Sequence, residues 1–264
     1  ASTASKLRGE SGTKVLVEVS SESGEIREVD LERRSVDLRP VRTKRLRDDS
    51  HTIGYLRITQ FSESVPKKVE EALQELKEKE VEGLILDLRN NSGGLVSSGI
   101  AVADSLLSEK PVVETKNRNG IKDAIISQKE TSFDGPMVTL VNKGTASASE
   151  ILAGSLQDNG RSILMGEQTY GKGLIQSLKS LGEKSGVAIT VASYLTPKGN
   201  NIQGQGIKPD KLLDLPDDTE YGSSDDKWVK NAELFLESIL EQEEVSLQTI
   251  EVNNEELKTE GAQD

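Results

Sequence analysis

The sequence predicts a layered α/β domain that follows a short β-rich segment. Between Ile53 and Gly166, apolar strands alternate with amphipathic helices, which is the pattern of a sheet covered by helices. Two of these strands run into glycine-containing loops, "NNSGG" and "NKGTAS". Residues 14–38 instead alternate apolar and polar side chains in two short runs joined by "SSESGE", as strands of a small sheet do.

The first half of the α/β region begins after a polar stretch. Residues 42–52 are predicted to be a linker, and "IGYLRITQF" is then predicted to be a strand. The run "SVPKKVEEALQELKEKE" predicts a helix, because Ser64 is placed to cap it and Pro66 is tolerated in its first turn. Three apolar residues fall on one face of this helix: Val69, Leu73 and Leu76.

The second half repeats a strand–glycine turn–helix order. The strand "GLILDLR" is nearly all apolar, which is typical of a strand covered on both faces. It leads into "NNSGG" and the helix "LVSSGIAVADSLL". The strand "MVTLVN" likewise leads through a glycine turn into the helix "ASEILAGSLQDN". A third strand, "SILMGE", precedes "TYGKG" and the strands "LIQSLKSL" and "GVAITVASYLT".

The region after Pro216 is acidic and poor in apolar residues. Within it, "DDKWVKNAELFLESILEQEE" predicts an amphipathic helix. The last twenty or so residues are predicted to be frayed or disordered. Four apolar residues are available to pack the helix onto the rest of the chain: Trp228, Leu234, Leu236 and Leu240.

Composition excludes several classes of function. The net charge of −12 argues against nucleic-acid binding, and no apolar run is long enough to span a bilayer. There is no cysteine, which excludes thiol nucleophiles, thiolate metal sites and disulfides. The single histidine, His51, lies in a polar stretch and is predicted to be a surface residue, so no metal site is expected. One basic cluster is interpreted as a solvated strand and linker: Arg33, Arg34, Arg39, Arg42, Lys44, Arg45 and Arg47.

The loop "GTASASEI" places three hydroxyl side chains ahead of a helix. Ser147 and Glu150 have capping-box spacing, and such a pattern is usually structural. A serine at a strand-to-helix turn is also well placed as a nucleophile, because the turn pushes its oxygen out of the sheet. It needs a base to react at neutral pH. The residues alone do not choose between Ser147 and Ser149.

Carboxylates or a lysine remain as candidates for such a base, since one histidine in a polar stretch makes a Ser–His–Asp triad improbable. A lysine base must lose its proton, which burial or a nearby positive charge favours. Lys172 fits better than the lysines on charged helix faces, because it lies between two glycines and between apolar strands. On a regular strand Gln176 would share its face and could bind its amine. The alternative is an ordinary surface turn.

The glycine loops offer backbone N–H groups that could bind phosphate or an oxyanion. "NNSGG" lacks the lysine and hydroxyl of a Walker loop, so nucleotide binding is not indicated. The alternative is that glycine is present only because a tight turn requires it.

Taken together, these segments resemble the carboxyl-terminal processing peptidases, also called tail-specific proteases, and most closely their cyanobacterial and plastid branch. The resemblance extends from about Gly54 to Asp210 and includes "GYLRITQF", "GLILDLRNNSGG", "NKGTASASEILAGSLQDNGR", "GEQTYGKGLIQ", "GVAITVASYLTPKG" and "GQGIKPD". It implies a crotonase-like layered α/β protease core. It also implies an extracytoplasmic location, in the bacterial periplasm or the thylakoid lumen.

The resemblance implies a serine endopeptidase with a Ser–Lys dyad that cleaves protein substrates near their C-termini, with no metal or cofactor. Substrates, membrane-associated ones included, would be bound through their C-terminal region. The implied residues are catalytic Ser147, Lys172 and Gln176, the oxyanion-hole N–H groups of Gly93, Gly94 and Ala148, and the supporting carboxylates Glu150 and Asp158.

The resemblance also divides the chain. Residues 1–40 would be the closing strands of an incomplete PDZ-like domain, 41–215 the protease core, and 216–264 an acidic helix and tail. The family's carboxylate-binding loop and PDZ helix have no counterpart here. Two other interpretations stay open: a catalytically idle peptide-binding scaffold of the same fold, and a crotonase-type acyl-CoA enzyme. No adenine-nucleotide pocket is indicated for the latter.

Overall fold

The structure is a computed structural model, and it shows two compact units, Ala1–Arg39 and Pro40–Asp264. In the first unit, helix α1 (Thr3–Leu7) precedes the antiparallel strands β1 (Lys14–Ser20) and β2 (Ile26–Glu32), which confirms the two strands predicted there. The residues described are 3–21, 23–34, 39–47, 51–120, 122–128, 130–182, 185–214 and 219–260.

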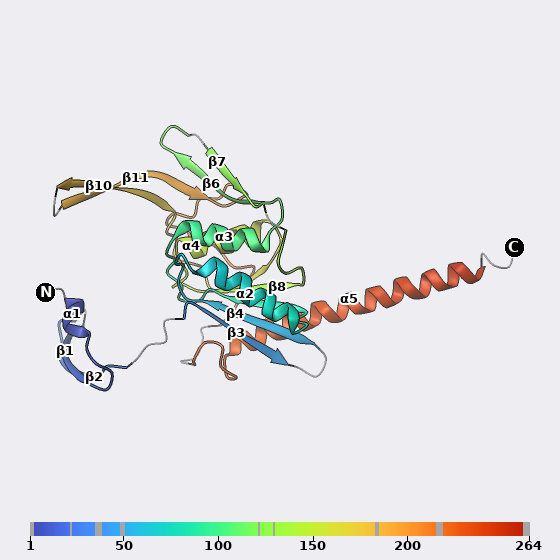
Figure 1. Cartoon of the computed structure of the whole chain (residues 1–264), viewed down its shortest axis with the longest axis horizontal. Coiled ribbons are helices and arrows are strands. Elements are labelled where there is room, and N and C mark those ends of the chain that lie inside the picture. The colour runs from blue at the N-terminus through green and yellow to red at the C-terminus, as the bar shows by residue number, and fades with distance from the viewer. Residues whose placement is uncertain are drawn as a thin grey trace. The chain divides into compact units, whose positions relative to one another are not determined.

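The second unit is built on a six-stranded sheet of order β12-β9-β8-β5-β4-β3 (Figure 1). Its neighbouring strands run parallel from β4 to β12, and β3 pairs antiparallel at the edge. This mixed α/β architecture confirms the predicted fold class. The strands are β3 (Val41–Arg47), β4 (Thr52–Ile58), β5 (Gly83–Asp87), β8 (Met137–Val141), β9 (Ile163–Gly166) and β12 (Lys211–Leu212).

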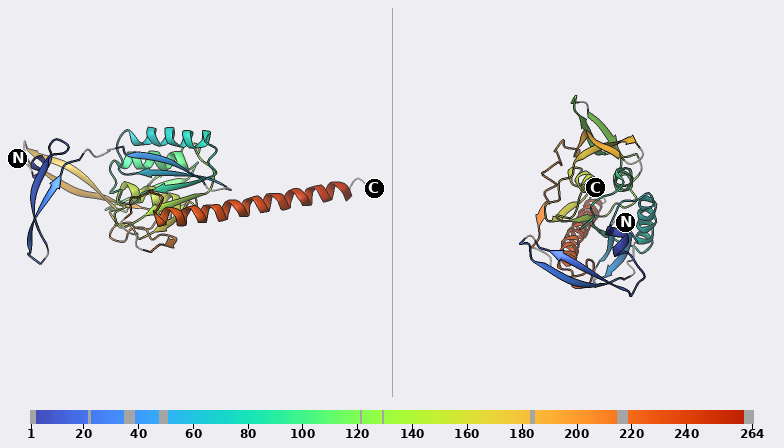
Figure 2. Two further views of the ribbon diagram at one scale, coloured as in Figure 1. Left: turned by 90° about the horizontal axis from the view of Figure 1, so that it is seen from below. Right: turned by 90° about the vertical axis from the view of Figure 1, so that its left-hand side faces the viewer.

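Helices cover both faces of this sheet, and strand alternation decides which residues meet which helix. Leu84 and Leu86 of β5 face the cluster formed with α2 (Val65–Glu78), α3 (Val96–Leu106) and α4 (Ala148–Asp158). Ile85, between them, faces the cluster formed with α5 (Lys227–Glu260). Figure 2 shows α2 and α5 on opposite sides of the strands.

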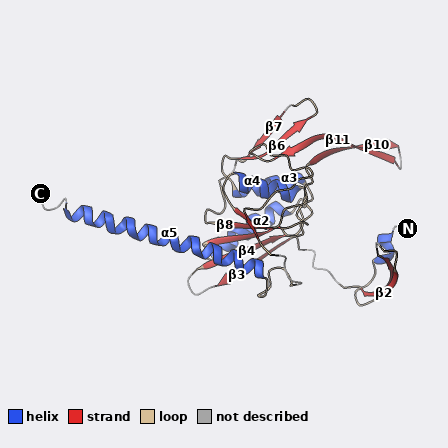
Figure 3. Cartoon of the chain, turned by 180° about the vertical axis from the view of Figure 1, so that it is seen from behind, coloured by secondary structure: helices blue, strands red, loops and turns tan. Residues whose placement is uncertain are grey.

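A second, four-stranded sheet of order β10-β11-β6-β7 is antiparallel throughout. The hairpin of β10 and β11 extends away from the helices, as the view from behind shows (Figure 3). Most of β11 is exposed, whereas Val112 and Val113 of β6 and Tyr194 near the end of β11 are buried in the core, so the sheet is packed at one end only. Its strands are β6 (Pro111–Asn117), β7 (Lys122–Ile126), β10 (Leu174–Gly182) and β11 (Ser185–Leu195).

The prediction of a linker over residues 42–52 was wrong for most of its length. Val41–Arg47 is the edge strand β3, paired with β4 along its whole length. Its arginines and lysine hid the strand pattern, and charged side chains are common on edge strands because they discourage further pairing. Val41 and Leu46 nevertheless pack against the two core clusters.

His51 was predicted to be a surface residue, and this was also wrong. It precedes β4 directly and is only 4% exposed. Its Nδ1 atom lies 3.4 Å from Glu82 Oε1, since the starts of the parallel strands β4 and β5 lie side by side.

The C-terminal helix is longer than predicted. α5 continues to Glu260, and residues 261–264 lie outside the described part of the chain. Trp228, Leu236 and Leu240 are buried as predicted, whereas Leu234 is 64% exposed. Among the described residues, none of the helices combines the length and apolar content needed to cross a membrane.

Candidate active site

Three loops meet at one edge of the six-stranded sheet. They follow β5, β8 and β9, and carboxyl ends of parallel strands share an edge. The Ala146 N–H donates to the Asn91 carbonyl oxygen (3.0 Å), which joins the first loop to the second. The Tyr170 N–H donates to the Thr145 carbonyl oxygen (3.0 Å), which joins the second to the third. Backbone hydrogen bonds therefore connect the three loops to one another.

Ser147 lies at the strained start of α4. Its backbone has φ 58° and ψ −119°, a conformation that residues other than glycine rarely adopt. The predicted capping box is present, and the Ser147 N–H donates to Glu150 Oε2 (2.8 Å). The side chain remains partly exposed, because this turn directs it out of the sheet.

The other two hydroxyls of this loop are structural. Thr145 Oγ1 donates to the Leu88 carbonyl oxygen (2.9 Å), and Ser149 Oγ donates to the Asn91 carbonyl oxygen (2.9 Å). Both residues are 0% exposed. Of the three hydroxyls that the sequence left open, only that of Ser147 is accessible to a substrate.

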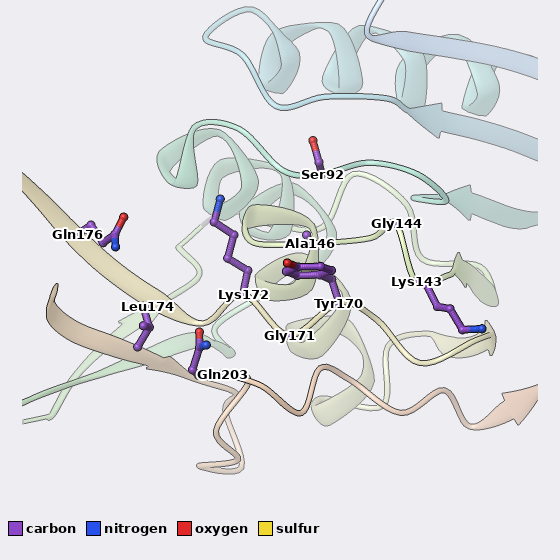
Figure 4. Close-up of a pocket in the computed structure, with 10 residues that line it drawn as sticks. All are labelled: Ser92, Lys143, Gly144, Ala146, Tyr170, Gly171, Lys172, Leu174, Gln176 and Gln203. Atoms are coloured by element: carbon purple, nitrogen blue, oxygen red, sulfur yellow. The ribbon is translucent and has the colours of Figure 1, made fainter. Parts of the chain in front are cut away.

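Lys172 and Gln176 line one cavity of about 550 Å³, together with Ser92, Ala146 and Tyr170 from the three loops. Figure 4 shows the Lys172 side chain reaching into the space between Gln176 and the Ser92 loop. The regular-strand alternation on which their pairing was predicted does not apply, because Lys172 precedes β10 and the strand has a register shift between Ile175 and Gln176. The lysine was also expected to be enclosed, whereas its side chain is exposed here.

Glu150 connects the serine to the lysine loop. Its carboxylate is fully buried, and its Oε2 atom accepts from both the Ser147 N–H (2.8 Å) and the Lys172 N–H (2.8 Å). The Oε1 atom accepts from Thr169 Oγ1 (2.6 Å) and from the Gly171 N–H (2.6 Å). One carboxylate thus fixes the backbone at both candidate catalytic residues. A capping role alone would account only for its bond to the Ser147 N–H.

The Gly93–Gly94 turn lies against Ser147. A Cβ atom at Gly93 would approach Ser147 Cβ to 2.9 Å, and one at Gly94 would approach the Phe61 carbonyl oxygen to 2.0 Å. With φ values of +99° and +139°, both positions require glycine. The Gly93 N–H already donates to Asn91 Oδ1 (2.9 Å). Gly94 is therefore the better oxyanion-hole candidate beside Ala148, the first residue of α4.

Asp158 does not join the cavity. It is the last residue of the 11-residue helix α4, so it lies about 15 Å along the helix from Ser147. Its Oδ2 atom accepts from the Lys198 N–H (2.8 Å). The structure thus gives this carboxylate a role in holding a remote turn.

A buried charge cluster behind the loops was not predicted from the sequence. Arg89 is 0% exposed and donates to both carboxylate oxygens of Asp87 (3.0 and 2.7 Å) and of Asp226 (3.0 and 2.6 Å). The signal was present in "GLILDLR", where two charged residues interrupt an apolar strand. Arg89 anchors the start of α5 to the end of β5.

The pKa values in this cluster shift in the direction that keeps it charged. Burial alone would raise the pKa of Asp226, but hydrogen bonds from Arg89 and from backbone N–H groups outweigh burial and lower it. Burial likewise opposes the charge of Arg89, yet its two aspartate partners raise the pKa of the guanidinium. Burial and the Asp87 carboxylate raise the pKa of Tyr55, which donates to Asp87 (2.6 Å).

Among the described residues, one group has potential metal-ligand atoms within 4.8 Å of one another: His51, Glu82 and Glu244. His51 and Glu82 precede β4 and β5, so they lie at the opposite edge of the sheet from Ser147. The carboxylates of Glu82 and Glu244 are exposed. This group therefore takes no part in the candidate active site.

Comparison with known proteins finds a family and several relatives for this chain. The sequence profile of peptidase family S41 matches residues 52–213. A carboxyl-terminal-processing protease of Synechocystis sp. is 46% identical over 81% of this chain and 50% of its own length. Carboxyl-terminal-processing peptidase 3, chloroplastic, of Arabidopsis thaliana is 42% identical over 78% of this chain and 42% of its own length.

A solved structure described as photosystem II D1 C-terminal processing protease superposes with a TM-score of 0.68 at 37% identity. The match covers 78% of this chain and 57% of that one. The chain thus spans about half the length of the curated relatives it matches. The family match spans the strands β4 to β12 and all three loops of the candidate site, so the chain belongs to peptidase family S41.

Proposed function

We propose that this chain is a serine endopeptidase that cleaves protein substrates near their C-termini, with Ser147 as nucleophile and Lys172 as general base. One observation carries the proposal. The buried Glu150 carboxylate binds the backbone of both residues, of which one is an accessible serine on a strained turn and the other a lysine that lines the cavity. Membership of peptidase family S41 and the names of the relatives support this chemistry.

In the proposed reaction, Lys172 Nζ accepts the proton of Ser147 Oγ while that oxygen bonds to the carbonyl carbon of the scissile peptide. The carbonyl π electrons move to the oxygen, which accepts hydrogen bonds from the N–H groups of Ala148 and Gly94. Lys172 then gives its proton to the leaving amine as the C–N bond breaks. A water molecule, deprotonated in the same way, hydrolyses the acyl-enzyme.

Because Lys172 is exposed in the free protein, we infer that a bound peptide completes the site. A peptide in the cavity would exclude water around the amine, and loss of solvation favours the neutral form that a base requires. Gln176, on the same side of the cavity (Figure 4), is placed to bind the amine once water has left.

The same relatives also bear on how substrates are captured, where the chain works and what the first unit is. We propose that substrates are captured by their C-terminal region and that the chain works outside the cytoplasm, in a periplasm or thylakoid lumen. One relative is named as chloroplastic. We further propose that residues 1–40 are the closing strands of a PDZ-like domain, supported by the separate compact unit that ends at Arg39.

The test is peptide cleavage by two variants, each with a matched control. Ser147→Ala and Lys172→Ala should lose cleavage and reaction with a serine-directed acylating probe, with thermal unfolding unchanged. Ser149→Ala alters a buried hydroxyl of the same loop, and Lys143→Ala removes another lysine of the same cavity. Both controls should still cleave. Full activity of Ser147→Ala, or an inactive Lys143→Ala beside an active Lys172→Ala, would refute the assignment.

A further inference from the structure

A tyrosine beyond the matched family region reaches the active-site loops. Tyr221 lies in the segment that leads to α5, after the S41 match ends at residue 213. Its hydroxyl oxygen accepts from Asn90 Nδ2 (3.1 Å) and from Asn142 Nδ2 (3.4 Å). These two asparagines stand at the start of the first and second loops.

The two asparagines join those loops to each other. Asn142 Oδ1 accepts from the Asn90 N–H (2.9 Å) and from the Gly144 N–H (3.1 Å). Asn142 Nδ2 also donates to Asn90 Oδ1 (2.9 Å). The pair thus sets the spacing between the turn that carries Gly94 and the turn that carries Ser147.

The Tyr221 hydroxyl completes the hydrogen bonding of both amides. A phenolic hydroxyl can donate or accept, and here it accepts from the Nδ2 end of each asparagine. This leaves the Oδ1 end of Asn142 to face the N–H groups of Asn90 and Gly144. Rotating the Asn142 amide by 180° would place its NH₂ group against these two backbone N–H groups. Both would then lose their acceptor, and unpaired donors are costly away from water.

Tyr221 is itself held by the buried charge cluster. Its ring lies under two guanidinium groups, with Arg89 Cζ 4.2 Å and Arg57 Cζ 4.7 Å from the ring centroid. The next residue, Gly222, donates its N–H to Asp226 Oδ2 (2.7 Å) and accepts from Lys44 Nζ (2.6 Å). The ring contacts and the backbone bonds of Gly222 therefore hold the hydroxyl in addition to its contacts with the two asparagines.

We propose that Tyr221 is a positioning residue that aligns the oxyanion turn with Ser147 through the side-chain amides of Asn90 and Asn142. The proposal rests on the proposed function and extends it. It assigns part of the catalytic geometry to the segment before α5, which contributes no group to the cavity itself.

The test is Tyr221→Phe, which removes the hydroxyl and keeps the ring beneath the two arginines. We expect kcat to fall about tenfold, with KM changed less than about twofold, because only the alignment of the reacting groups is altered. The rate of Ser147 acylation by the probe should fall by the same factor. Tyr55→Phe is the matched control, since it removes a buried hydroxyl that binds Asp87 in the same cluster but neither asparagine.

Tyr55→Phe should lower the unfolding temperature and leave kcat of the folded protein unchanged. In an Asn142→Ala background, Tyr221→Phe should change kcat by less than about twofold, because the connection is already lost. An unchanged kcat in Tyr221→Phe, a change confined to KM, or equal kcat losses in both tyrosine variants would overturn the inference. The proposed function fails separately, if Ser147→Ala still cleaves.

Discussion

The two sheets of the second unit differ in how they are held. Every residue of β5 and β8 in the six-stranded sheet is buried between helices, whereas residues 185–191 of β11 in the four-stranded sheet are all exposed. Ser147 follows a strand of the first sheet, and Lys172 lies in the loop between β9 of the first sheet and β10 of the second. The candidate base thus lies where the packed sheet leads into the exposed hairpin.

This difference shows which parts of the site are held by core packing and which are held by individual hydrogen bonds. Packing of the six-stranded sheet fixes the serine and glycine turns, since a dense core has low compressibility. The lysine loop leads from this core into the exposed hairpin, and hydrogen bonds to buried groups hold it in place, such as that from the Tyr194 N–H to the Gly173 carbonyl oxygen (2.7 Å). Glu150 provides two of them, to the N–H groups of Gly171 and Lys172.

The largest effect is expected from a cavity in the well-packed sheet. Leu86→Ala removes a 0% exposed side chain that faces α2, α3 and α4, and it should lower the free energy of unfolding by about 2–5 kcal/mol. Urea unfolding followed by circular dichroism measures this change. A loss below about 1 kcal/mol would mean that this sheet is not a rigid support for the site.

The next effect concerns the bond between the two regions. Glu150→Gln preserves shape but places an NH₂ group against two of the four donors that the carboxylate binds. We expect kcat/KM for peptide cleavage to fall about 100-fold, as a small misplacement of catalytic groups does. Glu75→Gln, on the exposed face of α2, is the matched control and should cleave normally. Normal cleavage by Glu150→Gln would contradict the alignment role.

A smaller effect, with a defined pH dependence, is expected at the charge cluster. Asp226→Asn should lower stability at neutral pH by about 1.5–3 kcal/mol, because a charged hydrogen bond to Arg89 is lost. The folded state lowers the pKa of Asp226, so wild type gains stability above the unfolded value of about 3.9 and loses it as pH falls through the folded value. Thermal unfolding of both proteins between pH 7 and 2.5 should therefore show the difference shrinking in acid. A constant difference would assign the loss to packing.

The smallest effect is expected on the exposed hairpin. Ile189 of β11 is 47% exposed, so Ile189→Ser should change the free energy of unfolding by less than about 0.5 kcal/mol. Urea unfolding beside Leu86→Ala provides the direct contrast between the sheets. A loss comparable to that of Leu86→Ala would show that this face is covered in solution.

Prediction from sequence succeeded where a strand is buried on both faces, because an unbroken apolar run such as Gly83–Asp87 is typical of a covered strand. It failed for β3, whose charged side chains suit an edge strand as well as a linker. The described strands β6 and β7 were not predicted at all. Val112 and Val113 of β6 are buried in the core, but two adjacent apolar residues lack the alternation that predicts a strand.

The loops that form the site could be predicted from the sequence, whereas the contacts of individual residues in those loops could be predicted only in part. The capping-box spacing of Ser147 and Glu150 is local, and the structure contains it. The choice of Ser147 over Ser149 depended on the resemblance, because burial against Asn91 is a contact 58 positions distant. Tyr221 is 131 positions from Asn90, and no short-range pattern announces such a contact.

The backbone of Ser147 also has a consequence for how this chain can change. Its φ of 58° and ψ of −119° suit glycine better than serine, so the conformation that exposes the hydroxyl stores conformational energy in the folded state. Selection for thermal resistance alone would favour glycine here and would discard the hydroxyl. Under the proposed function, serine at this position provides the nucleophile at some cost in stability.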